Sequence, residues 1–153
     1  MRSAYTAYFE EEILSASPLR LVCLLYQGAI SELRNARKYL AAAQVPERCA
    51  AISKACDILA ELTASLDRDS GGDTAVRLHE LYAYSTGRLL QANLRKEDAP
   101  LAEVLGLLTT LSEAWAQLAE SEREPSPTLT SPAVYASTYT NQNGEFVSQS
   151  WSF

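Results

Sequence analysis

The stretch LAEVLGLLTTLSEAWAQL, residues 101–118, decides the fold class of this chain. Its apolar residues recur at alternating steps of three and four, as one face of an α-helix requires. This stripe consists of Leu101, Val104, Leu108, Leu111, Trp115 and Leu118. Asp98 stands just before it and is predicted to cap the helix. A helix with a single apolar stripe must bury that stripe against other elements, so the rest of the chain should supply partners for it.

Three earlier segments carry the same periodicity. The first is predicted to begin at Ser17-Pro18, with serine as N-cap and proline at the first helical position. Its stripe is Val22, Tyr26, Ala29, Leu33, Ala36 and Leu40. The second helix is predicted from near Pro46 to about Asp67, with the stripe Cys49, Ile52, Cys56, Leu59, Leu62 or Thr63, and Leu66.

The third helix is predicted to follow a turn at SerGlyGlyAsp, residues 70–73, with Asp73 as its cap. Its stripe is Leu78, Leu81, Tyr82, Ser85, Leu89 and Ala92. Short connections make consecutive helices antiparallel, so the sequence predicts an all-α, up-down four-helix bundle over residues 17–124. Residues 1–16 are expected to form a short helical segment before the bundle. Residues 125–153, rich in Ser, Thr and Pro, are expected to form a largely irregular, disordered tail.

Composition limits the classes of function. The chain has 153 residues, 47% of them hydrophobic and 21% charged, which is typical of one globular domain. A net charge of −6 argues against nucleic acid or an anionic membrane as the main partner. We find no apolar run long enough to insert into a membrane and no secretion signal, and the three cysteines form no CxxC pair. A cytoplasmic protein is expected.

Catalytic and metal-binding interpretations find little support. A di-metal site in a helical bundle needs two Glu-x-x-His pairs, but His79 is the single histidine and Val76 precedes it by three residues. No Cys/His cluster has zinc spacing. A nucleophilic role for Cys23 would need a histidine brought near it in space, and this alternative stays open. The sequence predicts no catalytic residue, no cofactor and no metal ion, and thus no enzyme.

The first helix carries more apolar surface than a bundle can bury. Leu21, Leu24, Leu25 and Gly28 fall outside its core stripe. Glycine costs about 1 kcal/mol in a helix interior, so Gly28 suggests that something approaches the helix closely there. The third helix repeats the pattern more weakly with Tyr84, Gly87, Leu90 and Leu94. Three alternatives would cover such surfaces: an external partner, a further short helix of the same chain, or a second copy in a homodimer.

The N-terminal segment is a candidate for the internal cover. Tyr5, Tyr8, Phe9, Ile13 and Leu14 precede the bundle and are too apolar to remain free in water. Such a segment could shield an apolar groove and move aside when a partner binds. Residues 1–16 are therefore interpreted as a groove cover.

Several short motifs occur in an order and spacing that resemble a known family. They are Tyr5-x-x-Tyr8, SerAlaSerPro at 15–18, LeuLeuTyrGlnGlyAlaIle at 24–30, LeuTyrAlaTyr at 81–84, ArgLeuLeuGlnAlaAsn at 88–93 and LeuSerGluAlaTrp at 111–115. Each motif alone is weak, but the series over residues 5 to about 118 resembles the flagellin-specific export chaperones, the FliS family.

The resemblance implies a cytoplasmic chaperone. Such a protein binds the disordered C-terminal region of flagellin in hydrophobic grooves, prevents early polymerisation and delivers it to the flagellar export gate protein. Leu21, Leu24, Leu25 and Gly28 are the first candidates for contact with this partner, and Tyr84, Leu90 and Leu94 the second. Tyr5, Tyr8 and Ile13 would form the cover and contribute to docking at the gate. The alternative is a helical-bundle interaction module for another secretion or signalling partner.

Overall fold

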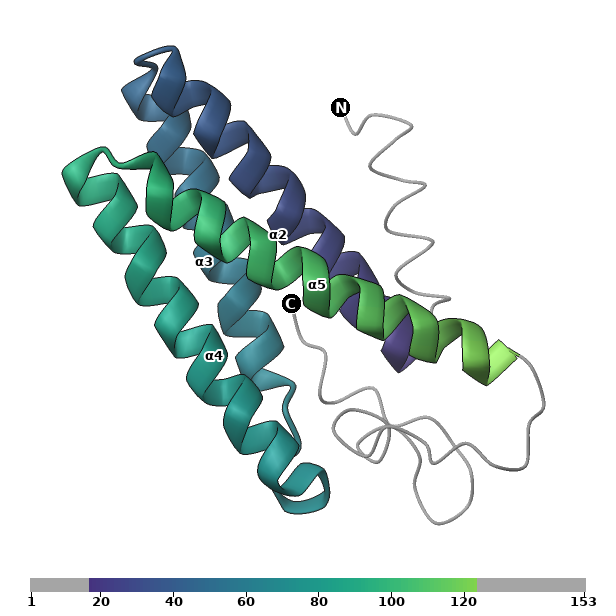
Figure 1. The fold of residues 1–153 in the computed structure, drawn as a ribbon. Coiled ribbons are helices and arrows are strands. Elements are labelled where there is room, and N and C mark those ends of the chain that lie inside the picture. Colours follow the sequence, from purple (N-terminus) through teal and green to yellow (C-terminus); the bar gives the residue numbers. More distant parts are fainter. Residues whose placement is uncertain (1–16, 124–153) are drawn as a thin grey trace, which may run out of the picture.

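The computed structural model describes residues 17–123, which form four α-helices (Figure 1). The helices are α2 (Pro18–Ala41), α3 (Val45–Ala64), α4 (Arg68–Arg95) and α5 (Asp98–Arg123). Helix α2 packs against α3 and α5, and α4 packs against the same two helices. Each helix therefore neighbours the next one along the chain, and the last returns to the first. The predicted all-α up-down bundle is confirmed.

The first helix begins where the sequence predicted. Ser17 is the N-cap of α2, and its Oγ accepts a hydrogen bond of 3.2 Å from the backbone N–H of Arg20. Pro18 occupies the first helical position, where its missing N–H costs nothing. Among the described residues, this is the local signal that the structure reproduces most closely.

The connection between α3 and α4 differs from the prediction. Helix α3 ends at Ala64 rather than near Asp67, because Asp67 caps the next helix. Its carboxylate accepts from the backbone N–H groups of Asp69 and Ser70, so the cap lies six residues before the predicted Asp73. The predicted turn appears instead as a kink inside α4 at Gly72, whose φ of 56° and ψ of −137° suit a residue without a Cβ.

The core consists of one face from each helix. Its side chains with at most 1% exposure include Val22, Leu33, Ile52, Leu59, Leu62, Leu89, Leu101, Val104 and Leu108. All nine stand on the predicted stripes. On α3 the predicted stripe was placed slightly to one side, since Ala51 and Ala55 are buried while Cys49 and Cys56 are only half-buried. Alanine carries a weak hydrophobic signal, which hid the true centre of that face.

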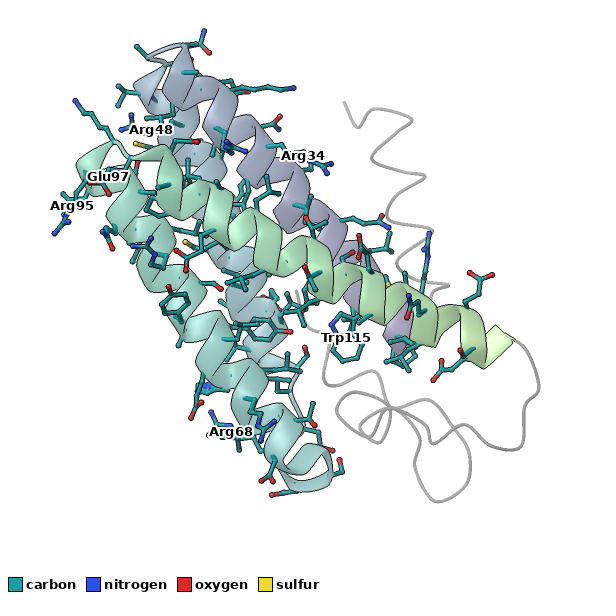
Figure 2. The ribbon with its side chains drawn as sticks, in the orientation of Figure 1. Arg34, Arg48, Arg68, Arg95, Glu97 and Trp115 are labelled. Carbon is teal, nitrogen blue, oxygen red and sulfur yellow. The ribbon has the colours of Figure 1, made fainter. Side chains whose placement is uncertain are left out.

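Three aromatic side chains meet inside the bundle, as the sequence predicted for the core. Tyr26 of α2, Tyr82 of α4 and Trp115 of α5 are all buried, and Figure 2 labels the indole on α5. The ring centroid of Tyr26 lies 6.4 Å from that of Tyr82 and 6.4 Å from that of Trp115. The two tyrosine Oη atoms are 2.6 Å apart, so one hydroxyl donates a hydrogen bond to the other. This hydrogen bond joins α2 to α4 through the core.

Polar contacts hold the end of the bundle where α4 passes into α5. Arg48 of α3 is buried there, and its Nε donates to Oδ1 of Asn93 over 3.1 Å (Figure 2). Helix α4 ends at Arg95, and its C-cap residue Lys96 adopts the left-handed conformation. Asp98 then begins α5, and its carboxylate accepts from Nε and Nη2 of Arg37 at 2.8 and 2.9 Å. These contacts tie α3 to α4, and α2 to the start of α5.

Replacing Leu108 by aspartate should unfold the bundle, because an unpaired carboxylate would enter a site with no exposure. We expect a loss of roughly 3–5 kcal/mol in the free energy of unfolding, visible as lost helical circular dichroism or a collapsed melting temperature. Gly106→Asp adds the same charge to an exposed position of the same helix and should leave helix content unchanged. A Leu108→Asp protein that melts like the parent would contradict the assigned core.

The Arg37–Asp98 pair should make stability depend on acid. The hydrogen bonds from Arg37 lower the pKa of the Asp98 carboxyl from 3.8. The contribution of the pair to folding stability is therefore complete above pH 3.8. The contribution is lost as the pH falls through the lower folded pKa. At neutral pH Asp98→Asn should cost about 0.5 kcal/mol, since both side chains are partly exposed. Thermal unfolding should show this difference vanishing in strong acid, and a pH-independent difference would disprove the effect.

Candidate partner-binding surface

Most of the large hydrophobic side chains left exposed in the described part of the chain lie on α4. Over residues 17–122, the large hydrophobic side chains left exposed are Val45 (44%), Val76 (48%), Tyr84 (50%), Leu90 (56%) and Leu94 (83%). Four of these five belong to α4. Folding of the described bundle leaves this helix with apolar side chains in water, which marks a surface that another segment could cover.

The exposed residues of α4 line up along its axis. Val76 and Leu94 are about five helical turns apart and therefore point the same way. Ala83, Gly87 and Leu90 are also exposed and lie between them at helical spacing. We call Val76, Ala83, Gly87, Leu90 and Leu94 the α4 outer face. It lies opposite the residues that α4 gives to the core.

Gly87 leaves a low point in the middle of the α4 outer face. A Cβ added there would meet no atom within 4 Å, so this position faces open space. Ala83 stands one turn before it, with an equally small side chain. Another helix could therefore approach the backbone of α4 here more closely than at a leucine.

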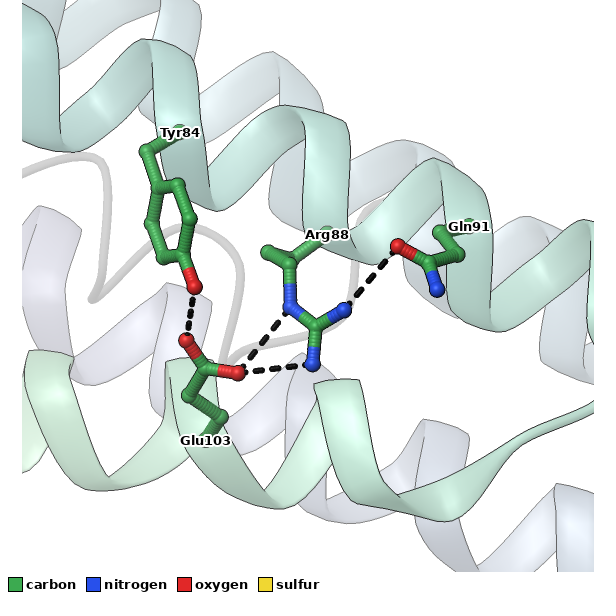
Figure 3. A network of polar contacts seen from close by, with 4 residues as sticks. All are labelled: Tyr84, Arg88, Gln91 and Glu103. Carbon is green, nitrogen blue, oxygen red and sulfur yellow. Dashed lines mark hydrogen bonds and ion pairs between the residues drawn. The ribbon is translucent and has the colours of Figure 1, made fainter.

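A polar network fixes the edge of α4 that faces α5 (Figure 3). Tyr84 donates its hydroxyl to Glu103 of α5, and Arg88 donates from Nε and Nη2 to Oε2 of the same carboxylate at 3.0 and 2.8 Å. Nη1 of Arg88 also donates to Oε1 of Gln91 over 2.9 Å. These bonds join α4 to α5 beside the α4 outer face.

The network decides what Tyr84 can offer to a partner. The hydrogen bond to Glu103 raises the pKa of Tyr84, and the bonds from Tyr84 and Arg88 lower the pKa of the Glu103 carboxyl. Because its hydroxyl is already engaged with an anion, Tyr84 presents its ring rather than a free donor. Its half-exposed ring adjoins the α4 outer face.

The candidate residues on α2 are covered to different extents. Leu21 is buried at 8% exposure, whereas Leu24, Leu25 and Gly28 are half-buried. Leu25 packs against the core. Leu21 does not belong to the contiguous core cluster that contains its neighbours Val22 and Cys23.

Packing within the bundle explains why residue 28 is a glycine. A Cβ on this residue would lie 3.3 Å from Cδ1 of Ile58, which is tighter than ordinary packing. Helix α3 therefore makes the close approach that the sequence led us to expect at this glycine. Contact of an external partner with Leu21, Leu24, Leu25 and Gly28 stays a prediction.

Two sets of predicted residues lie outside the described part of the chain. Tyr5, Tyr8 and Ile13, the predicted cover, belong to residues 1–16, and the predicted tail begins at Pro125. Their roles stay predictions. Within the described part, Val76 is the large exposed hydrophobic residue of α4 that sequence reasoning missed. Its distance of 18 residues from Leu94 is the signal that would have found it.

Over 17–123 no group of three or more His, Cys, Asp and Glu side chains is placed to hold a metal ion. Cys23 lies at a cleft between α2 and α5 that is also lined by Arg20, Ser112 and Glu120. Burial raises the pKa of the Cys23 thiol, whereas a nucleophile needs it lowered. No helix in the described part has the length and apolar character needed to cross a membrane.

Comparison with known proteins assigns the chain to a family. Residues 1–122 match the sequence profile of the family described as flagellar protein FliS. The chain is 44% identical over 110 residues to the flagellar secretion chaperone FliS of Salmonella typhimurium, covering 71% of this chain and 82% of that protein. It is 35% identical over 115 residues to the flagellar secretion chaperone FliSB of Pseudomonas aeruginosa, covering 75% and 91%.

A more distant relative matches over a longer stretch. The flagellar secretion chaperone FliS of Bacillus subtilis is 31% identical over 124 residues, covering 81% of this chain and 92% of that protein. The family match and these identities lead to one conclusion: this chain belongs to the FliS family of flagellar secretion chaperones.

Proposed function

We propose that this protein is a cytoplasmic chaperone that binds the disordered C-terminal region of flagellin, prevents its premature polymerisation and delivers it to the flagellar export apparatus. The observation that carries the proposal is the α4 outer face, exposed on a chain of the FliS family. A protein that must bind and release an unfolded client needs apolar surface that its own fold leaves uncovered.

The α4 outer face suits a client segment that becomes helical on binding. It extends from Val76 to Leu94, roughly 27 Å at 1.5 Å per residue, which is enough for about five turns of a client helix. An amphipathic helix would place its apolar side chains on this face, with its backbone passing closest at Gly87. Tyr84 would then contact the client through its ring.

The α4 outer face alone would not bind a client tightly. Complete burial of Leu90 and Leu94 would contribute about 1.5–3 kcal/mol for each side chain. Ordering a disordered client costs about 2–5 kcal/mol, which offsets much of this gain. We therefore propose a second contact area on α2, formed by Leu21, Leu24, Leu25 and Gly28, so that the client wraps around the bundle.

We further propose that the N-terminal segment covers the α2 contact area in the absence of client. Tyr5, Tyr8 and Ile13 would provide the apolar side chains of this cover. Their displacement by flagellin would free them for the export gate protein, so that loading and docking are coupled.

Titration against the C-terminal region of the flagellin from the same organism tests the main proposal. Calorimetry should give a dissociation constant in the micromolar range or tighter. Leu90→Asp and Leu24→Asp should each weaken binding by at least tenfold, since each places a charge where apolar contact is expected. Ala50→Asp, an exposed substitution of the same charge on α3, is the matched control and should leave binding unchanged.

Circular dichroism of the same variants distinguishes a loss of binding from a loss of folded structure. Both leucine variants should keep their helix content. If Leu24→Asp unfolds the bundle, Leu24 is a core residue and the α2 contact area is misplaced. If the parent protein binds no flagellin, the client is a different secretion or signalling partner.

Replacing Tyr5, Tyr8 and Ile13 together by serine tests the cover. The variant should bind more of a hydrophobic dye and associate more readily with itself, because the α2 contact area would lose its apolar cover. Replacing Ser3, Thr6 and Glu11 by alanine alters the same segment without removing its large apolar side chains, and should have no such effect. Equal dye binding by the parent and the first variant would reject the cover.

A further inference from the structure

Residues 125–153 are not accounted for by the family. The match to the FliS family ends at residue 122, so this segment lies wholly beyond it. It contains three prolines and a single charged residue, Glu145. It also contains five aromatic residues, which are Tyr135, Tyr139, Phe146, Trp151 and Phe153. A segment with so many apolar rings and so little charge gains by covering apolar surface.

We propose that residues 125–153 bind in cis to the α4 outer face, with their aromatic side chains on Leu90 and Leu94. The segment would then compete with the client for this face. The cis contact stands on the described surface and on the sequence of the segment, whereas the competition also rests on the proposed function.

The α4 outer face is the best match for this segment in the described part of the chain. Leu94 and Leu90 are the two most exposed large hydrophobic side chains there, at 83% and 56%. None of the five residues of the α4 outer face is charged; the exposed charges beside it in sequence are Arg77, Glu80, Arg95 and Lys96. The small side chains at Ala83 and Gly87 leave space beside the leucines for a flat aromatic ring.

Residues 125–153 find no strand to pair with in the described part of the chain, and this determines how they can bind. Residues 134–139, ValTyrAlaSerThrTyr, alternate as a strand would, but a strand needs the edge of a sheet. The described residues 17–123 contain helices and no strand, so they offer no such edge. The segment must therefore bind through its side chains, and a helix surface accepts them without backbone pairing.

The length of the segment permits the contact. Pro125 and Pro127 prevent α5 from continuing, so the chain is free to turn back after Arg123. About 30 extended residues reach roughly 100 Å, whereas α4 is only about 42 Å long. A tethered segment has an effective concentration of about 1 mM, so contacts with a dissociation constant of about 0.1 mM or lower would keep the face largely occupied.

The consequence is regulation of client binding. A face that is covered most of the time binds a client with an affinity reduced by the uncovered fraction. The client must displace the segment, so partners with few apolar side chains would be rejected. The same cover would keep the exposed leucines of α4 from causing aggregation before a client arrives.

Methyl NMR of the full chain tests the cis contact. Leucine methyl resonances are compared between the parent and a variant in which all five aromatic residues of the segment are replaced by serine. Ring currents should displace the Leu90 and Leu94 methyl resonances in the parent, and the variant should lose this displacement. The methyl resonances of Leu108, buried in the core, should not change and serve as the internal control.

Trp151 fluorescence provides the reciprocal measurement. Replacing Leu90 and Leu94 together by serine should shift the emission of Trp151 to longer wavelength, as the indole enters water. A Trp151→Phe protein gives the signal of Trp115 alone for subtraction. Both leucines are exposed, so the double variant should fold. Unchanged methyl resonances and unchanged emission would overturn the proposal.

Dilution distinguishes binding of the segment in cis from binding of a second copy of the chain to the α4 outer face. A contact in cis keeps its methyl displacement on tenfold dilution, whereas a displacement that disappears would assign the α4 outer face to a dimer and overturn the proposal. The five-serine variant should also bind flagellin several-fold more tightly than the parent. Failure of the parent to bind flagellin would count against the proposed function, while the NMR comparison would still decide the cis contact.

Discussion

A four-helix bundle can bury only one face of each of its helices, and α4 is apolar on two. Its inner face gives Leu78, Tyr82 and Leu89 to the core, and its outer face leaves Leu90 and Leu94 in water. Turning the helix to bury the outer face would expose the inner one. Repacking therefore cannot bury all the apolar side chains of α4. The function that we propose depends on this constraint, because an uncovered apolar face is what an unfolded client can bind.

The α4 outer face can bind a client in the way that we propose only if α4 keeps a fixed position in the bundle. The Tyr26–Tyr82 hydrogen bond fixes the inner side of α4 within the core, where an unpaired hydroxyl would be costly. On the surface, Glu103 holds the edge of α4 against α5 through Tyr84 and Arg88. The first interaction contributes mainly to stability, and the second, being exposed, mainly to orientation. Together they hold the α4 outer face in a fixed geometry for the client that we propose.

Much of the fold could be predicted because its signals are local. Ser17 with Pro18 marks a helix start, and the stripe from Leu101 to Leu118 marks a buried face, whatever lies elsewhere in the chain. The errors arose where two local signals competed. Asp67 and Asp73 are both suitable caps on either side of two glycines, and the choice between them depends on where α3 ends. For the α4 outer face, Leu90 and Leu94 were predicted to lie off the core face, whereas Val76 was not.

The sequence by itself determined which residues of each helix share a face, because helical periodicity is a property of the chain alone. Only the tertiary structure decided which of the remaining apolar residues stay in water. Leu21 and Leu94 both stand outside a core stripe, yet one is 8% exposed and the other 83%. Gly28 likewise has Ile58 as its neighbour, from a helix 30 residues further on. Cover of this kind comes from side chains that are distant in sequence, and a periodicity within one helix contains no information about them.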